Sequence, residues 1–266
     1  MTYETLEIEV RDGIGRVWLN RPQIRNAFND TAIAELAKAF TAMGGDPAVR
    51  VVVLGGRGSA FSAGGDLNWM KKMAGYTFDE NCADALGLAE MLHTIATLPK
   101  PTVARVHGPA YAGGMGLVAA CDIAVAAEEA EFCLSEVKLG LVPATISPYV
   151  LAAIGKRAAH RYFLTAERFS AAEALRIGLV HALAPAAGID DAVAGICREL
   201  LSGGPDAQAA SKELIRDVAG APLAPELLAD TARRIATARA TSEGQEGVRA
   251  FLEKRRPAWL PKKTAS

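Results

Sequence analysis

A run of four apolar residues, Val51-Val52-Val53-Leu54, constrains the fold of this chain most strongly, and Gly55-Gly56 follows it directly. A strand without a polar face has to be covered on both sides, which is typical of the parallel strands of α/β proteins. Other short apolar runs alternate with helical patterns along the chain. This alternation predicts an α/β fold with its functional loops at the strand ends.

Local signals around this strand predict further elements. Residues 6–10 and 14–19 alternate apolar and polar side chains on either side of Asp12-Gly13, which indicates a hairpin. Asp30 is predicted to cap the helix that follows. The segment Ser170-Ala171-Ala172-Glu173 has the pattern of a capping box at the start of a later helix.

The chain is expected to divide into a core, residues 1–200, and a C-terminal helical region, residues 201–266. Only helical patterns remain from about residue 189 onward, and Gly-Gly-Pro and Gly-Ala-Pro segments interrupt them. With 266 residues, of which 50% are hydrophobic, the chain can bury a large core and carry an appendage. Such an appendage can pack on its own core or on a neighbouring subunit.

Charge and cysteine spacing exclude several classes of function. A formal net charge of −1 provides no long-range field for nucleic acid. The N-terminus lacks a signal-peptide pattern and the apolar runs are shorter than the roughly 18 residues of a membrane helix, so we expect a cytoplasmic protein without a membrane partner. The cysteines form no CxxC pair, so we expect no metal site and four buried thiols. These are Cys82, Cys121, Cys133 and Cys197.

Two glycine-rich turns, residues 59–67 and 108–116, are candidates for ligand binding. Glycine lets a ligand approach the main chain, and a helix that begins near Gly114 would direct unpaired N–H groups and its positive dipole end at that ligand. The turns match neither the P-loop nor the GxGxxG pattern. The residues alone leave two alternatives open, an oxyanion hole or glycines required only by tight turns.

Glu136 is a candidate acid/base residue because it lies in the mainly apolar segment 131–140. Burial would raise the pKa of this carboxyl toward the range useful in catalysis. The alternative is an ion pair with Lys138 or with another cation. The four histidines are scattered and no GxSxG elbow accompanies them, so a serine hydrolase triad is not predicted.

Five segments spread over the chain carry a family resemblance. They are Leu19-Asn20-Arg21-Pro22 with Asn26-Ala27-Phe28, then Phe61 to Leu67, Gly113-Gly114 before Cys121-Asp122-Ile123, Phe132 to Leu139, and Phe251 to Arg255. In order and spacing they resemble the crotonase (enoyl-CoA hydratase/isomerase) superfamily. The resemblance implies a spiral of ββα units with a C-terminal α-helical trimerisation region, assembled as a homotrimer or homohexamer. It also implies an acyl-CoA substrate, with CoA as part of the substrate and no separate cofactor.

By position, the resemblance implies a role for each residue of the site. The N–H groups of Gly65 and Gly113 correspond to an oxyanion hole, and Glu136 corresponds to a catalytic glutamate. Lys254 corresponds to a basic residue that reaches a CoA phosphate, including one bound to a neighbouring subunit. The implied substrate- and CoA-binding residues are Ala63, Gly64, Gly65, Asp66, Leu67, Gly113, Gly116, Ala144 and Lys254.

Two departures from the ordinary hydratases bear on the reaction. Gly116 stands where those enzymes carry a second catalytic glutamate, and the segment 143–150 replaces a glycine-rich one. Residues 61–70, 133–137 and 146–150 together resemble bacterial methylglutaconyl-CoA hydratases of leucine degradation. The resemblance therefore predicts hydration of 3-methylglutaconyl-CoA to 3-hydroxy-3-methylglutaryl-CoA.

Several alternatives to this reaction stay open. The same fold could hydrate isohexenylglutaconyl-CoA or a short-chain enoyl-CoA, or it could isomerise an enoyl-CoA with one glutamate. A non-catalytic or RNA-associated homologue is the alternative from another functional class. A substrate with its own carboxylate would require a cation in the acyl pocket, for which Arg25, Lys71 and Lys72 are candidates.

Overall fold

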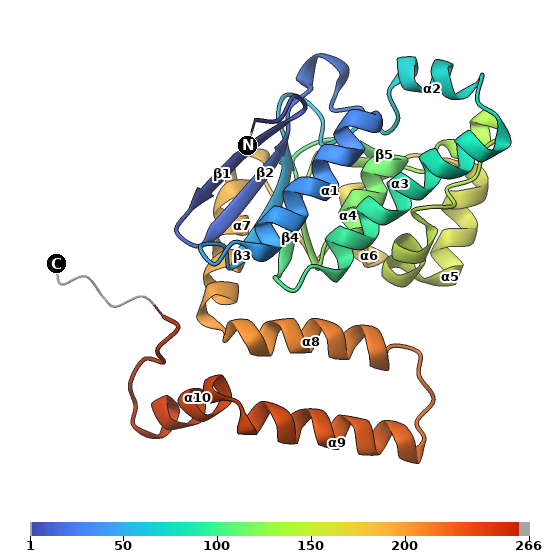
Figure 1. Ribbon diagram of the computed structural model, residues 1–266. Coiled ribbons are helices and arrows are strands. Elements are labelled where there is room, and N and C mark those ends of the chain that lie inside the picture. Colours follow the sequence, from blue (N-terminus) through green and yellow to red (C-terminus); the bar gives the residue numbers. More distant parts are fainter. Residues whose placement is uncertain (1, 261–266) are drawn as a thin grey trace.

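A six-stranded sheet forms the centre of the computed structural model, which describes residues 2–260. Its strand order is β1-β2-β3-β4-β6-β9, and a smaller sheet has the order β5-β7-β8 (Figure 1). In the large sheet only β1 and β2 pair antiparallel. The strands are β1 (Leu6–Arg11), β2 (Ile14–Leu19), β3 (Val51–Gly56), β4 (Thr102–Val106), β5 (Ala110–Tyr111), β6 (Ile123–Ala127), β7 (Glu131–Cys133), β8 (Phe169–Ser170) and β9 (Ala182–Ala184).

Helices cover both faces of the large sheet, so the predicted α/β class is confirmed (Figure 1). Val52 and Leu54 of β3 belong to one apolar core with α1 and α3, whereas Val51 and Val53 belong to a second core with α7. The helices are α1 (Asp30–Gly45), α2 (Leu67–Met73), α3 (Phe78–Thr97), α4 (Gly113–Ala120), α5 (Ser147–Thr165), α6 (Ala171–Arg176), α7 (Ile189–Ser202), α8 (Pro205–Val218), α9 (Pro225–Ala240) and α10 (Ser242–Leu252).

The predicted N-terminal hairpin is confirmed. Leu6 pairs with Leu19 at its open end, and Arg11 pairs with Ile14 beside the turn. The turn residue Asp12 has a φ of 54°. The following glycine also has a positive φ, which is typical of the tight turns that match the twist of two antiparallel strands.

The cap of α1 differs from the prediction by one residue. The side chain of Asn29 accepts a hydrogen bond from the Ala32 N–H at 3.0 Å, so Asn29 is the N-cap and Asp30 is the first helical residue. Both residue types suit a cap. The extended backbone at Asn29, which the sequence pattern does not specify, decides between them.

The predicted capping box of α6 is only half formed. Ser170 accepts a hydrogen bond from the Glu173 N–H at 3.3 Å, as predicted. The Glu173 carboxylate does not return to Ser170, because it binds the Tyr162 hydroxyl and the Arg176 guanidinium instead. These stronger charge-assisted partners displace the reciprocal bond.

The prediction of four buried cysteines is wrong for Cys82, which is exposed on α3, whereas Cys121, Cys133 and Cys197 are buried. Cys82 lies in the first part of α3, where most side chains face solvent.

Within residues 2–260, no group of three or more His, Cys, Asp or Glu side chains is arranged to hold a metal ion.

The helices α8, α9 and α10 extend away from the main body of the molecule (Figure 1). The predicted boundary between residues 200 and 201 falls inside the last turn of α7, which ends at Ser202. The division into two units stays a prediction. Among the described residues no helix combines the length and the apolar character that crossing a membrane requires.

Candidate active site

The two glycine-rich turns pack directly against each other. A Cβ added to Gly64 would lie 3.0 Å from the Ala112 Cβ, and one added to Gly114 would lie 2.7 Å from the Ser62 carbonyl oxygen. The Tyr111 N–H also donates to the Ser62 carbonyl at 2.9 Å. Glycine is therefore required where the backbones of the two turns approach each other.

Phe28 connects the two turns. Its N–H donates to the Gly64 carbonyl at 2.9 Å, and its carbonyl accepts from the Asp66 N–H at 3.0 Å. Its ring lies against Gly113, where an added Cβ would come within 2.3 Å of the ring. The extended segment at Phe28 thus fixes the position of Gly65 relative to Gly113.

Two backbone N–H groups remain available at this junction. Within residues 2–260, neither the Gly65 N–H nor the Gly113 N–H donates to an acceptor. Gly113 is the first residue of α4, so its N–H is one of the donors that a helix leaves unpaired. Ala112 before it has φ 48° and ψ −121°, a strained conformation that sets the plane of the Ala112–Gly113 peptide. The arrangement can stabilise an oxyanion.

Asp66 holds the first turn in place, with its carboxylate directed at the protein. It caps α2 by accepting from the Asn68 N–H at 2.7 Å, and it pairs with the Arg21 guanidinium at 2.8 Å. Arg21 also donates to the Ala27 carbonyl at 2.7 Å. Burial opposes ionisation of Asp66, but the hydrogen bonds from Asn68 and Arg21 outweigh it and lower the pKa of Asp66.

The sequence pattern does not predict the role of Arg21. It marks Arg21 only as part of the Leu19 to Pro22 motif and does not indicate which residue it binds. The structure shows that the partner is Asp66 in the distant glycine-rich turn. We infer that Arg21 positions the turn that carries Gly65.

Glu136 lies at the start of a short 3-10 helix, η2 (Glu136–Leu139). Its Oε2 atom is buried and has no hydrogen-bond partner within the described chain. Desolvation raises the pKa of Glu136 above its ordinary value of 4.5. Lys138 is exposed and no cation of the described residues pairs with Glu136, so the ion-pair alternative is wrong.

Strand pairing brings Glu136 to the same edge as Gly113. The strands β5 and β7 are parallel, with Tyr111 paired to Cys133, so their carboxyl ends face the same way. Gly113 follows the end of β5, and Glu136 follows the end of β7. The Ala112 N–H donates to the Cys133 carbonyl at 2.8 Å and so connects the segments that follow β5 and β7. One acid and two free N–H donors therefore share this edge.

Ile146 occupies the space beside Gly116. A Cβ added to Gly116 would lie 2.2 Å from the Ile146 Cγ2 and 2.8 Å from its Cβ. Ile146 is 2% exposed, so it has no room to move aside. There is therefore no room at position 116 for a second carboxylate. The apolar side chain of Ile146 fills that space instead.

The other residues predicted to bind the substrate or CoA lie in different parts of the chain. Ala63 lies in the first turn, where its N–H donates to the Arg25 carbonyl at 2.9 Å. Leu67 and Ala144 are exposed, Leu67 at the start of α2 and Ala144 in the turn before α5. Lys254 follows α10, which lies apart from the main body that contains α2 and α4 (Figure 1).

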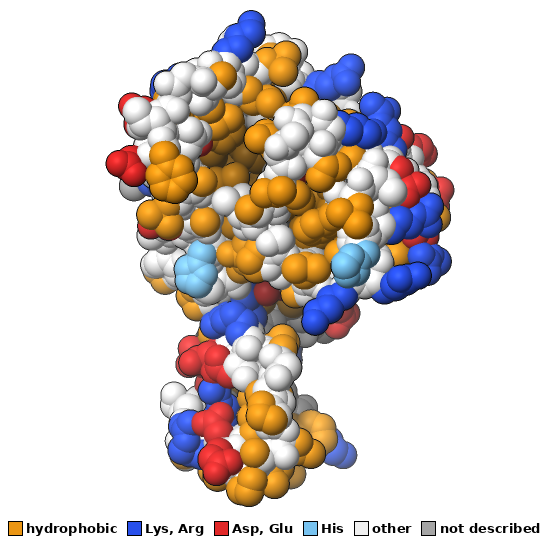
Figure 2. Space-filling view, turned by 90° about the vertical axis from the view of Figure 1, so that its right-hand side faces the viewer, with side chains coloured by type: hydrophobic (Ala, Val, Ile, Leu, Met, Phe, Trp, Pro, Cys, Tyr) orange, Lys and Arg blue, Asp and Glu red, His pale blue; other side chains and the backbone are white. Residues whose placement is uncertain are grey.

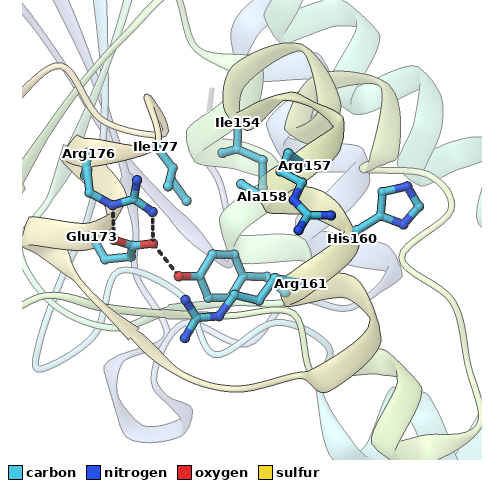
Figure 3. A pocket seen from close by; sticks show the side chains of 9 residues that line it. Ile154, Arg157, Ala158, His160, Arg161, Glu173, Arg176 and Ile177 are labelled. Carbon is cyan, nitrogen blue, oxygen red and sulfur yellow. Dashed lines mark hydrogen bonds and ion pairs between the residues drawn. The ribbon is translucent and has the colours of Figure 1, made fainter.

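Figure 2 shows a hollow lined by hydrophobic side chains on the side of the body where α2, α3 and α5 lie. Two further cavities are separate from the junction of the turns. One of about 700 Å³ lies between α5 and α6 (Figure 3), and another of about 940 Å³ lies between the core and α8. Neither is lined by Gly65, Gly113 or Glu136.

Comparison with known proteins identifies the family of this fold and site. The family model for enoyl-CoA hydratase/isomerase matches residues 9–262. The chain belongs to the enoyl-CoA hydratase/isomerase family. The crystal structure of an enoyl-CoA hydratase from Shewanella pealeana superimposes with a TM-score of 0.94 at 41% identity and covers 96% of each chain.

Two other relatives agree with this membership. An enoyl-CoA hydratase structure from Mycobacterium smegmatis has a TM-score of 0.89 at 33% identity, covering 96% of this chain and 99% of its own. A Thermus thermophilus protein provisionally named an enoyl-CoA hydratase is 39% identical over 252 residues, which are 94% of this chain and 99% of the relative. These similarities confirm the crotonase fold that the sequence resemblance implied.

Proposed function

We propose that this protein hydrates the α,β double bond of an enoyl-CoA thioester. The observation that carries the proposal is the junction of the two turns, where the free N–H groups of Gly65 and Gly113 share an edge with the partly buried Glu136. Relatives named as enoyl-CoA hydratases over nearly the whole chain support the same reaction.

The proposed mechanism uses the two N–H donors to bind the thioester oxygen. As water attacks C3, negative charge moves onto this oxygen, and each preorganised donor contributes about 3 kcal/mol of transition-state stabilisation. Ionised Glu136 accepts a proton from the attacking water and, once protonated, donates a proton to C2. The hydroxyl group and the proton of one water molecule are thus added across the double bond. CoA takes part as a portion of the substrate, without a separate cofactor.

We further propose 3-methylglutaconyl-CoA as the substrate, which gives 3-hydroxy-3-methylglutaryl-CoA in leucine degradation. The resemblance of residues 61–70, 133–137 and 146–150 to methylglutaconyl-CoA hydratases supports this choice. Within the last segment, Ile146 forms an apolar wall beside Gly116, where ordinary hydratases carry an acid. Of the candidate cations for the substrate carboxylate, Lys72 already pairs with Asp30 at 3.1 Å. Arg25 and Lys71 have no ion pair within residues 2–260 and remain the two candidates, and the backbone carbonyl of Arg25 contacts Ala63 in the first turn.

Enoyl-CoA isomerisation is the second candidate function, because Gly116 stands at the position of the second catalytic glutamate and a side chain added there would collide with Ile146. A single glutamate beside an oxyanion hole can remove a proton from C2 of a 3-enoyl-CoA and return it to C4. This reaction needs neither water nor a second acid. The blocked space at Gly116 is compatible with it.

The absorbance of the conjugated thioester distinguishes these functions. The purified protein is mixed separately with 3-methylglutaconyl-CoA, with crotonyl-CoA and with a 3-enoyl-CoA. We expect the fastest loss of absorbance with 3-methylglutaconyl-CoA. Loss with crotonyl-CoA alone would retain hydration but contradict the substrate. A gain of absorbance with the 3-enoyl-CoA and no loss with the other two would identify an isomerase.

A further inference from the structure

The cavity between α5 and α6 is lined by an unusual number of cationic groups. Arginines from both helices surround it, and a histidine, a tyrosine and one carboxylate complete its polar lining (Figure 3). Three apolar side chains lie together on one side of the same cavity. The lining comprises Arg157, His160, Arg161, Arg176, Glu173, Tyr162, Ile154, Ala158 and Ile177.

The single carboxylate of the lining is already fully bound. Arg176 donates to both oxygens of Glu173, from Nε at 2.6 Å and from Nη2 at 2.7 Å. The Tyr162 hydroxyl donates to the same carboxylate at 2.6 Å. These bonds hold the pKa of Glu173 at about 2, with Arg176 as the largest cause, so the group stays ionised and neutralises Arg176 alone.

Several donors of the cavity have no acceptor. Arg161 is held by Glu167 through Nε and Nη2, in the same way as Arg176 is held by Glu173. The Nη1 group of each arginine donates to nothing within residues 2–260, and Arg157 has no ion pair or hydrogen bond there. Two guanidinium groups are therefore fixed in place with free N–H groups, and a third is entirely free.

The charges around the cavity do not balance. Three arginines face two carboxylates, Glu173 and Glu167, which leaves a net positive charge even with His160 neutral. Arg157 and Arg161 also stand one helical turn apart, where like charges repel each other. An anion bound between them would remove this repulsion and satisfy the free donors.

We propose that this cavity, the α5–α6 site, binds the phosphoryl group of a small organic phosphate. Arginine donors match a tetrahedral oxyanion, and prior fixation of Arg161 and Arg176 reduces the entropy lost on binding. The cavity of about 700 Å³ is much larger than a phosphate ion. Ile154, Ala158 and Ile177 provide an apolar surface for the organic part. The site is separate from the two turns and from Glu136.

Calorimetric titration of the full chain at low ionic strength tests the site with two probes. Phenylphosphonate carries the oxyanion and an apolar ring, whereas inorganic phosphate carries the oxyanion alone. We expect both to bind, phenylphosphonate more tightly, and both to weaken with added salt because the arginines are exposed. Tighter binding of inorganic phosphate would exclude an organic phosphate as the ligand. No heat from either probe at millimolar concentration would overturn the proposal.

Arg157→Gln is the decisive variant, because Arg157 makes no described contact on which folding depends. It is expected to weaken phenylphosphonate binding about tenfold, as for the loss of one charge-assisted hydrogen bond. The matched control is Lys156→Gln, which removes the same charge from an exposed neighbour outside the lining. Its effect should stay below about twofold. Equal losses in the two variants, or no loss in Arg157→Gln, would refute a specific site.

Discussion

Glu136 has a carboxyl oxygen, Oε2, that is buried and has no hydrogen-bond partner within residues 2–260. Because desolvation raises its pKa above 4.5, the folded protein binds this proton more strongly than the unfolded chain does. Its contribution to stability is therefore largest below pH 4.5 and decreases as the pH rises through the higher folded-state pKa. The same shift places the acid limb of kcat/KM above pH 4.5, since hydration begins with ionised Glu136.

Replacement of Glu136 by glutamine tests both consequences. Glu136→Gln should lower turnover about a hundredfold or more, because the amide cannot accept the proton of water, while binding of the CoA ester persists. The free energy of unfolding at neutral pH should not decrease, since a desolvated charge is removed. Steady-state kinetics and urea denaturation measure the two effects. Near-normal turnover would contradict the assigned role.

The contact between Gly116 and Ile146 predicts a second residue-scale effect. Gly116→Ala should destabilise the fold by about 1–3 kcal/mol, because the new methyl group collides with Ile146. In a chain that carries Ile146→Gly, the further change Gly116→Ala should cost less, which a double-mutant cycle in urea measures. Gly87→Ala on α3 is the control, as its added Cβ meets nothing within 4 Å. Additive effects of Gly116→Ala and Ile146→Gly would show that the two residues do not compete for space.

At the scale of elements, a partly buried ion pair joins α8 to the core. Lys212 of α8 contacts the Asp122 carboxylate at 2.5 Å and the Lys100 carbonyl at 3.0 Å. Asp122 also accepts hydrogen bonds from the N–H and the hydroxyl of Thr102 at the start of β4. The side chain of Lys212 is 10% exposed and that of Asp122 is 27% exposed, so removal of one partner leaves the other poorly solvated.

Lys212→Met should therefore destabilise the protein by about 2 kcal/mol, below the range for a fully buried pair because Asp122 keeps some contact with water. Urea denaturation at a fixed protein concentration measures the loss. Glu213→Met, an exposed neighbour on α8 without a described partner, should change stability by less than about 0.5 kcal/mol. Similar losses in the two variants would mean that the ion pair does not stabilise the docking of α8.

At the scale of the whole molecule, the C-terminal region from α8 to α10 exposes large apolar side chains that a monomer would leave in water. Leu223 is 84% exposed and Phe251 is 82% exposed. Large apolar side chains exposed in this way are typical of subunit interfaces. We propose that the chain assembles as a homotrimer or homohexamer through these helices. The position of Lys254 beyond α10 would then allow it to reach a CoA phosphate bound to a neighbouring subunit.

Sedimentation velocity tests the assembly. The wild-type chain should sediment as a trimer or hexamer, and Phe251→Asp should shift it toward smaller species because the charge cannot be buried at an apolar interface. Leu164→Asp, at a site 70% exposed on α5 of the main body, is the control and should leave the mass unchanged. A monomeric wild-type chain at micromolar concentration would contradict the proposal.

Several features of the fold and site could be predicted from the sequence because they depend on neighbouring residues. The apolar run 51–54 predicted a strand covered on both faces, and Asp12-Gly13 predicted the hairpin turn. The glycines of the two turns and the apolar surroundings of Glu136 also marked the candidate site. Each signal reflects a local backbone conformation or a local preference for burial, which a short segment determines by itself.

Contacts between distant segments could be decided only by the tertiary structure. The pairing of Arg21 with Asp66 and the packing of Ile146 beside Gly116 depend on which segments meet after folding. So does the absence, among residues 2–260, of an ion pair at Glu136. On the basis of the local sequence alone, each of these side chains could contact many different residues. Close packing of the whole core selects one arrangement among them, because each buried group must fit the space and polarity left by its neighbours.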